Sequence, residues 1–329
     1  MAESRRVQIV STGAAVPEKV ITNFDLEKMV DTSNEWIIER TGISRRHIVD
    51  ETTATSDLAY GAAQQALEGA GVGPEEIDVI IVGTSSPDML FPATGCLVQN
   101  LLGATRAAAF DVSAGCSGFL YALDIGRAMI STGGAETVLV IGAEILSKFV
   151  DWEDRSTCVL FGDGAGAVVL KPSAVSRGIL LTFLKSDGSL GDLLKLPGGG
   201  TRCPATHESV DAKQHCIKMA GREVFKSAVK AMGDAAVHIL SEAGLSADKI
   251  DLFIPHQANI RIIQATAKKI DIPMEKVYVN VDEYGNTSAA SIPISLHEVR
   301  ENGRLKEGDL CLMVSFGTGF TWASALVQF

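Results

Sequence analysis

Short apolar runs alternate along the chain with longer stretches of helical character. Four runs have the length of a β-strand and end at Gly, Pro or charged residues: 79–82, 138–141, 168–170 and 252–254. Four longer windows are expected to form helices: 57–68, 117–130, 225–243 and 259–269. Because the strand runs are apolar throughout rather than at alternate positions, each strand is expected to be covered on both faces. The pattern predicts an α/β fold in which helices are layered over sheets.

The chain also repeats part of itself. Residues 66–83 read ALEGAGVGPEEIDVIIVG and residues 239–256 read ILSEAGLSADKIDLFIPH. Each segment has a helix, a Gly stop, an acidic turn and a buried strand. Identical residues at an offset of 173 are Leu67, Ala70, Gly71, Ile77 and Asp78, which match Leu240, Ala243, Gly244, Ile250 and Asp251. The same offset aligns the strand 138–141 with 311–314.

These matches predict two related halves, 1–174 and 175–329, packed about a pseudo-twofold axis. Loops that follow equivalent strands would meet at the junction, where a site is expected. At a slightly smaller offset of 170, Gly115-Cys116-Ser117 aligns with Gly285-Asn286-Thr287. Cys116 and Asn286 would then converge. The alternative is two ordinary α/β units that share similar capping chemistry.

Composition narrows the class of protein. The 329 residues include 29 Lys and Arg against 40 Asp and Glu, and the net charge of −11 disfavours nucleic acid as a partner. No apolar run has the ~18–20 residues of a membrane span. The start of the chain has no signal-peptide core, so a cytoplasmic location is expected. The six cysteines form no C-x-x-C pair, so neither a metal site nor a disulfide framework is expected.

Cys116 is the cysteine of greatest chemical interest. In the segment FDVSAGCSGFLY (110–121) a strand ends, small residues form a turn, and an apolar helix begins at or just after Cys116. A thiol at a helix N-terminus faces unpaired backbone amides and the positive end of the helix dipole. The pKa of Cys116 is therefore expected to fall, which makes it a candidate nucleophile. The alternative is a packing cysteine at a tight turn.

Two further residues follow buried strands or lie at Gly-flanked turns. His256 comes directly after a strand in FIPHQAN (253–259), where α/β sheets place functional groups. The alternative is a histidine that only caps the strand end. Asn286 lies in YGNTSAAS (284–291), at the place aligned with Cys116, and is otherwise a plain turn residue. Four other histidines are expected to be structural or at the surface: His207, His215, His238 and His297.

Two Gly-rich segments are candidates for a functional role. Gly162–Gly166 has G-x-G-x-G spacing, but a strand follows it instead of a helix. A dinucleotide site is therefore rejected, and a tight turn before a core strand is predicted. The segment FGTGF (316–320) follows the predicted strand 309–315, and its backbone amides can supply an oxyanion hole.

Together, Cys116 in AGCSGF, His256 in IPHQAN and Asn286 in YGNTSAAS resemble the Cys–His–Asn site of the thiolase-superfamily condensing enzymes. DTSNEWIIERTGI (31–43), LFPATGC around Phe91 and the closing FGTGFTWASALVQF are similar to β-ketoacyl-acyl carrier protein synthase III, the initiator of bacterial fatty-acid synthesis. The resemblance covers essentially the whole chain. It implies a layered α-β-α-β-α sandwich with the Cys in the first half and the His and Asn in the second.

The resemblance also implies the chemistry. Cys116 attacks the thioester of a short acyl-coenzyme A, with acetyl expected, and coenzyme A leaves. Malonyl-acyl carrier protein then binds, and His256 and Asn286 assist its decarboxylation by hydrogen bonding to the developing enolate oxygen. The carbanion attacks the acyl-enzyme, while backbone amides of Cys116, Gly317 and Thr318 hold the oxyanion. No cofactor or metal is implied, because both thioesters are substrates.

The same resemblance assigns binding residues by motif match. Trp36 and Arg40 line the coenzyme A entrance, with Arg155 and Asn259 beside them. Phe91 bounds the acyl pocket, across the interface of a homodimer.

A basic patch is implied for the carrier protein. Arg261, Lys268 and Lys269 share one predicted helix. An acidic enzyme with an acidic partner needs such local basic contacts, because the long-range charge disfavours docking. The alternative for Lys268 and Lys269 is an ordinary solvated helix face.

The sequence also bears on other members of the superfamily and on proteins of another class. A degradative thiolase needs a second catalytic Cys in the C-terminal Gly-rich turn, whereas Cys311 lies inside the preceding strand. A plant-like polyketide synthase would be longer, and a non-catalytic relative would have lost one of the three residues. A starter-unit condensing enzyme of a secondary-metabolite pathway stays open, as does the choice of acyl group. The polar segment 198–214 is expected to be a loop, longer than is usual in the family.

Overall fold

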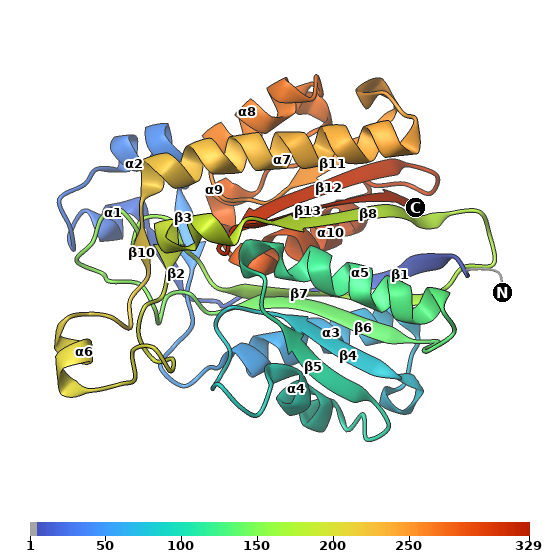
Figure 1. Cartoon of the computed structure of the whole chain (residues 1–329), viewed down its shortest axis with the longest axis horizontal. Coiled ribbons are helices and arrows are strands. Elements are labelled where there is room, and N and C mark those ends of the chain that lie inside the picture. Colours follow the sequence, from blue (N-terminus) through green and yellow to red (C-terminus); the bar gives the residue numbers. More distant parts are fainter. Residues whose placement is uncertain (1–4) are drawn as a thin grey trace.

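Two large β-sheets and three layers of helices form the body of the molecule, in a computed structural model that describes residues 5–329 (Figure 1). From top to bottom, the helical layers are α7 (Gly221–Ala243) with α8 (Ile260–Lys269), α5 (Gly118–Ser131) with α10 (Ser291–Glu301), and α3 (Thr55–Ala70) with α4 (Thr94–Leu102). The predicted α-β-α-β-α sandwich is confirmed. The middle helical layer is buried between two sheets, which explains why α5 is mostly apolar.

The two sheets have matching strand orders. The lower sheet, in order, is β1 (Val7–Ala15), β7 (Gly164–Pro172), β6 (Val138–Glu144), β4 (Val79–Gly83) and β5 (Ala108–Val112). The upper sheet, in order, is β8 (Gly178–Ser186), β13 (Thr321–Gln328), β12 (Leu310–Gly317) and β11 (Leu252–Pro255). In both sheets the first three strands are antiparallel and the next pair is parallel. In the lower sheet, β5 pairs with β4 in parallel. At the matching edge of the upper sheet there is an isolated parallel bridge between Phe253 and Val277.

The chain passes from one sheet to the other between Pro172 and Gly178. This passage falls at the boundary expected between residues 174 and 175. The origin of the two halves from one repeated unit stays a prediction.

Matched turns connect the sheets to the middle helices. The 3₁₀ turn η2 (Gly115–Ser117) leads into α5, and the 3₁₀ turn η6 (Ser288–Ala290) leads into α10, 173 residues later in both cases. The residue that takes the place of Cys116 in the second half is therefore Ala289. The prediction that Asn286 takes this place is wrong, because Asn286 precedes the turn instead of lying within it.

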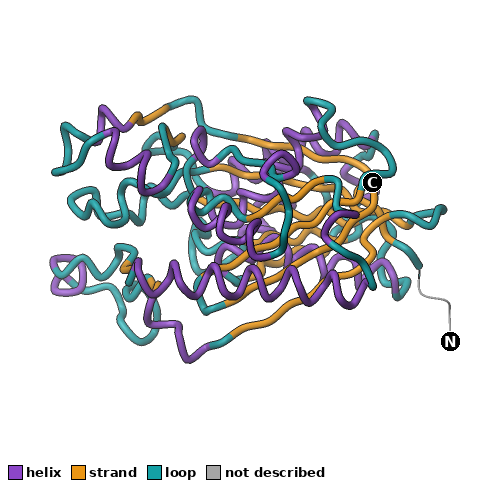
Figure 2. The backbone as a smooth tube through the Cα atoms, turned by 90° about the horizontal axis from the view of Figure 1, so that it is seen from above, coloured by secondary structure: helices purple, strands orange, loops and turns teal. Residues whose placement is uncertain are grey.

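Shorter elements and loops gather at the end of the molecule away from both termini (Figure 2). They are β2 (Val20–Thr22), α1 (Asn23–Leu26), α2 (Asn34–Thr41), β3 (Arg45–His47), β9 (Leu194–Lys195), α6 (His207–Asp211), β10 (Lys218–Met219) and α9 (Val281–Tyr284). The polar segment 198–214 forms most of the connection from β9 to β10 and contains α6. The turn predicted at Gly162–Gly166 is shorter than expected, because β7 begins at Gly164.

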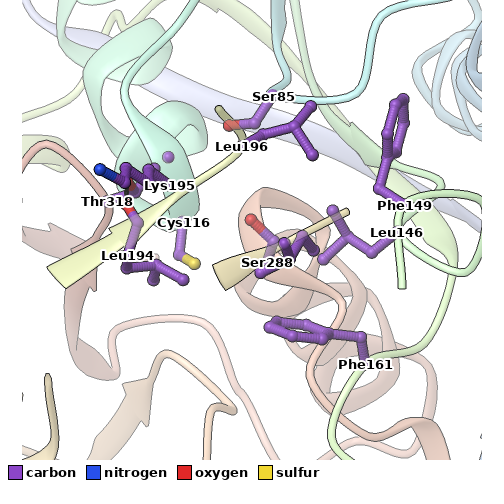
Figure 3. A pocket seen from close by; sticks show the side chains of 12 residues that line it. Ser85, Cys116, Leu146, Phe149, Phe161, Leu194, Lys195, Leu196, Ser288 and Thr318 are labelled. Atoms are coloured by element: carbon purple, nitrogen blue, oxygen red, sulfur yellow. Dashed lines mark hydrogen bonds between the residues drawn. The ribbon is translucent and has the colours of Figure 1, made fainter. Parts of the chain in front are cut away.

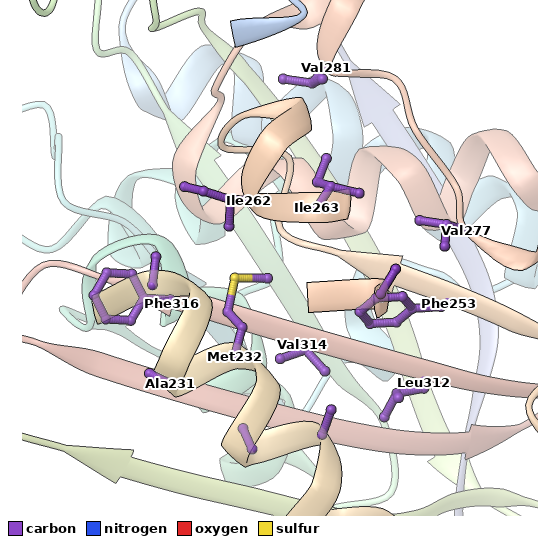
Figure 4. Close-up of a cluster of buried hydrophobic side chains, with 14 of the residues drawn as sticks. Ala231, Met232, Phe253, Ile262, Ile263, Val277, Val281, Leu312, Val314 and Phe316 are labelled. Carbon is purple, nitrogen blue, oxygen red and sulfur yellow. The ribbon is translucent and has the colours of Figure 1, made fainter. Parts of the chain in front are cut away.

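Apolar packing holds α7 and α8 against the upper sheet (Figure 4). Met232 from α7 and Ile263 from α8 pack with Phe253 of β11 and Val314 of β12, and all four are fully buried. Burial of one such side chain stabilises a fold by about 1.5–3 kcal/mol. This cluster fixes the N-terminus of α8 relative to the end of β11, where His256 lies. Within residues 5–329, no helix combines the length and the apolar composition that a bilayer span requires.

Candidate active site

Cys116 lies in the turn η2, two residues before the start of α5. Cys116 is partly buried, and desolvation raises its pKa to about 12 because a thiolate there loses much of the water that would stabilise it. The Ser288 hydroxyl at the same pocket opposes this rise, whereas the charge of Glu144 adds to it. The prediction of a lowered pKa is wrong. The start of α5 is present and would lower the pKa of Cys116, but the desolvation effect is larger. Cys116 is therefore a neutral thiol at rest.

His256 follows β11 and is 2% exposed. Its backbone N–H donates to Val314 O at 2.8 Å, which fixes it to the end of β12. Its Nδ1 lies 2.7 Å from Ser291 Oγ, at the start of α10. Burial lowers the pKa of His256 to about 3, so the imidazole is neutral at physiological pH.

Asn286 is held by its backbone and by its side chain. Its N–H donates to Leu160 O at 2.8 Å, and its carbonyl accepts from the Gly162 N–H at 3.1 Å. Its Oδ1 accepts from the Ser288 N–H at 2.9 Å. Because Oδ1 is occupied in this way, the NH₂ end of the amide is the end available to a ligand.

One cleft of about 660 Å³ brings Cys116, His256 and Asn286 together. The residues come from three separate turns: Cys116 and His256 follow the strands β5 and β11, and Asn286 follows the helix α9. The convergence expected at the junction of the halves is therefore present. What each residue does chemically stays a prediction at this point.

The backbone around Cys116 is tightly packed. A Cβ placed on Gly317 would overlap the backbone nitrogen of Cys116, so only glycine permits this approach. A Cβ placed on Gly115 would lie 2.6 Å from the Thr318 nitrogen. The Thr318 hydroxyl donates to Leu194 O, which ties this turn to β9. The three residues predicted to form the oxyanion hole thus lie together.

The predicted coenzyme A residues line the outer part of the cleft. The guanidinium carbons of Arg40 and Arg155 lie 5.6 Å and 5.4 Å from the centre of the Trp36 ring. Asn259 Nδ2 donates to Arg40 O at 2.9 Å, which joins α2 to the start of α8. An aromatic ring with two cations near it suits the flat base and the phosphates of a nucleotide.

The basic residues predicted to dock the carrier protein lie at opposite ends of α8. Arg261 lines the cleft, with its guanidinium carbon 5.4 Å from the Phe225 ring centre. Lys268 and Lys269 lie at the other end, about 12 Å along the helix axis. Lys269 Nζ is paired there with Asp234 at 2.6 Å. Two further cations at the cleft, Arg222 and Lys226, were missed because they begin α7 without any motif.

A small pocket of about 90 Å³ opens beside the thiol (Figure 3). Ser85 and Ser288 supply hydroxyls near Cys116. The apolar side chains around it are Leu146, Phe149, Phe161, Leu194, Leu196 and Ile217. Sequence reasoning missed them because they come from distant segments, and none has a pattern that distinguishes it from a core residue.

Phe91 does not line this pocket within the chain. It is 84% exposed, next to the exposed Leu90. The expected contribution across a homodimer interface stays a prediction.

Known proteins resemble the chain over its full length. Residues 110–188 match the family described as 3-oxoacyl-[acyl-carrier-protein (ACP)] synthase III, and residues 240–329 match the C-terminal part of that family. The β-ketoacyl-[acyl-carrier-protein] synthase III of Caldanaerobacter subterraneus subsp. tengcongensis is 54% identical over 328 residues, which are 100% of this chain and 99% of that protein.

Solved structures give the same result. The 3-oxoacyl-[acyl-carrier-protein] synthase III from Aquifex aeolicus VF5 superposes with a TM-score of 0.91 at 51% identity, over 98% of this chain and all of that chain. The priming β-ketosynthase from the R1128 polyketide biosynthetic pathway also has a TM-score of 0.91, at 33% identity, over 100% of this chain and 98% of that chain.

The fold and the Cys–His–Asn cleft define a thiolase-like condensing enzyme, which is an acyltransferase. Within that class, the chain belongs to the β-ketoacyl-acyl carrier protein synthase III family. The family predicted from the sequence motifs is confirmed.

Proposed function

We propose that this enzyme joins a short acyl group from acyl-coenzyme A, acetyl above all, to malonyl-acyl carrier protein, as the initiating condensation of fatty-acid synthesis. The observation that carries the proposal is the meeting of Cys116, His256 and Asn286 in one cleft, beside a small apolar pocket. The products are a 3-ketoacyl-acyl carrier protein, coenzyme A and carbon dioxide.

In the first half-reaction, the Cys116 sulfur attacks the thioester carbonyl and coenzyme A leaves. The negative charge that develops on the carbonyl oxygen needs donors already in place. Gly317 packs directly against the Cys116 nitrogen, so the backbone amides of Cys116, Gly317 and Thr318 are the candidate donors. Trp36, Arg40, Arg155 and Asn259 hold the nucleotide end of coenzyme A at the mouth of the cleft.

In the second half-reaction, malonyl decarboxylation places negative charge on an enolate oxygen. The neutral His256 donates from Nε2, and Asn286 donates from its NH₂ group. This role requires the proton of His256 on Nε2, and the Ser291 hydroxyl favours that tautomer by donating to Nδ1. The carbanion then attacks the acyl-Cys116 carbonyl.

Pocket size supports a short starter. A volume of about 90 Å³ walled by leucine and phenylalanine side chains accepts a few carbon atoms. A long chain would have to displace Phe149 or Phe161 from a well-packed wall. The homodimer and the cytoplasmic location belong to this proposal as well. That the segment 198–214 is longer than is usual in the family stays a prediction.

Starter choice is tested by intact-protein mass spectrometry after incubation with acetyl-, isobutyryl- and octanoyl-coenzyme A. We expect one acyl adduct, mapped to Cys116, with acetyl the fastest. Preference for a branched or longer starter would favour a secondary-metabolite role over fatty-acid initiation. No adduct with any ester on folded, reduced protein would contradict the proposed first half-reaction.

Carrier-protein docking gives a second test. Arg261→Glu is expected to raise the KM for malonyl-acyl carrier protein about tenfold, because a repulsive charge replaces an attractive one at the cleft mouth. The KM for acyl-coenzyme A should change less. The control is Lys249→Glu, which makes the same change of charge before β11, at the end of that strand away from His256. Equal effects of the two variants would remove Arg261 from the docking patch.

A further inference from the structure

Arg46 is a buried cation that the mechanism above does not use. It is the middle residue of β3 and is 0% exposed. Burial lowers the pKa of Arg46 to about 10, so the guanidinium stays charged at physiological pH. Within residues 5–329, no aspartate or glutamate forms an ion pair with it, whereas the exposed Arg45 beside it pairs with Glu283 at 3.4 Å. Because a buried charge without a counter-charge is costly to a fold, stability alone does not explain the presence of Arg46.

The guanidinium group instead joins three segments of the chain through their carbonyl oxygens. Its Nη1 donates to Ile21 O of β2 at 3.2 Å and to Asn23 Oδ1 at 3.0 Å. Its Nη2 donates to Asn23 Oδ1 and to Val159 O, both at 3.0 Å. Asn23 begins α1 and is itself fixed, because its Nδ2 donates to Ile43 O at 2.7 Å. The planar guanidinium therefore ties Val159 to the paired strands β2 and β3.

The segment that begins at Val159 is also the one that holds Asn286. Leu160 O accepts from the Asn286 N–H at 2.8 Å, and the Gly162 N–H donates to Asn286 O at 3.1 Å. Between these two hydrogen bonds, Phe161 and Asn286 form an isolated parallel bridge. The backbone of Asn286 is therefore fixed to a short piece of chain whose first carbonyl group is bound by Arg46.

Arg46 also packs directly on two glycines at this contact. A Cβ placed on Gly285 would lie 3.3 Å from the Arg46 Cβ, and a Cβ placed on Gly162 would lie equally close to it. Gly285 has a φ of 66°, in the left-handed region, so the turn into Asn286 favours glycine at this position. The side chain of Arg46 thus limits the movement of the Asn286 turn from a second side.

We propose that Arg46 is a positioning residue for the decarboxylation step, which holds the backbone of Asn286 in the place from which its NH₂ group reaches the enolate oxygen. This inference rests on the proposed role of Asn286. The side chain of Asn286 is short and its Oδ1 is already bound to the Ser288 N–H, so a shift of the backbone displaces the donor as well. A misplacement of about 1 Å can lower a rate about 100-fold. Arg46 acts only through Asn286, because it does not line the cleft.

The first experiment measures hydrogen exchange by mass spectrometry in the free enzyme, without any substrate. Arg46→Lys keeps the charge but loses the planar fork, so only part of the carbonyl contacts can be kept. The amides of Asn286 and Gly162 should then exchange at least about tenfold faster than in the wild type, whereas those of β4 should be unchanged. Arg45→Lys is the matched control. It makes the same substitution one residue earlier on β3 and should leave all of these amides unchanged.

The second experiment measures carbon dioxide release from malonyl-acyl carrier protein in a double-mutant cycle. Arg46→Lys alone should lower kcat about tenfold and leave the KM for malonyl-acyl carrier protein within about twofold. In the Asn286→Ala background, the same substitution should lower kcat by less than about twofold more, because the donor that Arg46 positions is already gone. Arg46→Met, which puts no charge in the interior, takes the place of the lysine variant in both experiments if that variant does not fold.

Three results would overturn the proposal. One is unchanged exchange at Asn286 and Gly162 in a folded Arg46 variant. Another is equal acceleration at β4, which would show a general loss of stability. The third is a further loss of about tenfold in the Asn286→Ala background, which would show that Arg46 acts independently of Asn286. Failure of the proposed function would look different: Asn286→Ala alone would keep its rate of carbon dioxide release, and Arg46 would then have no catalytic group to position.

Discussion

Cys116→Ala is expected to lower condensation at least about 10³-fold, because it removes the only atom that can carry the acyl group between the two half-reactions. The substitution deletes one partly buried sulfur atom, so the fold should be retained. The measurement is the rate of 3-ketoacyl-acyl carrier protein formation from acetyl-coenzyme A, together with the intact mass of the enzyme after exposure to acetyl-coenzyme A alone.

The matched control for this result is Cys96→Ala. Cys96 is exposed on α4, so its loss should leave both the adduct and the turnover unchanged. An acetyl adduct of normal yield on the Cys116→Ala protein would place the nucleophile elsewhere. A variant that loses the adduct but keeps turnover would argue against a covalent intermediate.

His256→Ala and Asn286→Ala should separate the two half-reactions. Each removes one donor to the developing enolate, which is worth about 10²–10³ in rate. Carbon dioxide release from malonyl-acyl carrier protein should fall by that factor. Acylation of Cys116 by acetyl-coenzyme A should persist in both, because the neutral His256 has no assigned part in removing the thiol proton.

His297→Ala is the control for the histidine substitution. Its ring lies 3.1 Å from Thr12 Oγ1, between α10 and β1, and it does not line the cleft. Its removal should leave carbon dioxide release unchanged. A folded His256→Ala protein that fails to acylate would instead make His256 the base of the first half-reaction, and would contradict the division of labour.

Local sequence patterns predicted the layers well, because a continuous apolar strand such as Val79–Val82 has to be covered on both sides. They also predicted the place of the site, since Cys116 and His256 each follow a strand. The matched turn was assigned three residues too early for Asn286, because the local match of Gly-x-Ser to Gly-x-Thr was stronger than the correct pairing. Small residues at turns carry little alignment information.

Burial, and contacts between segments far apart in the chain, could not be predicted from local patterns. The raised pKa of Cys116 depends on side chains from both halves that exclude water, and no window around residue 116 contains them. The pocket wall joins Leu146 and Phe161 to Ile217, which are far apart in the chain. The pairing of Lys269 with Asp234 likewise depends on how α7 lies against α8.

The ends of β6 and β12 explain why a nearly symmetric molecule has a single reaction centre. Their last residues, Glu144 and Gly317, are matched in position, and each faces the turn that starts a middle helix. Glu144 accepts from the Ser288 hydroxyl, so its carboxyl group already occupies that turn. Gly317 leaves the corresponding Cys116 amide open to an anion that exists only during the reaction. The two matched strand ends therefore differ in what faces the following turn: a carboxyl group in one half, and an open backbone amide beside Cys116 in the other.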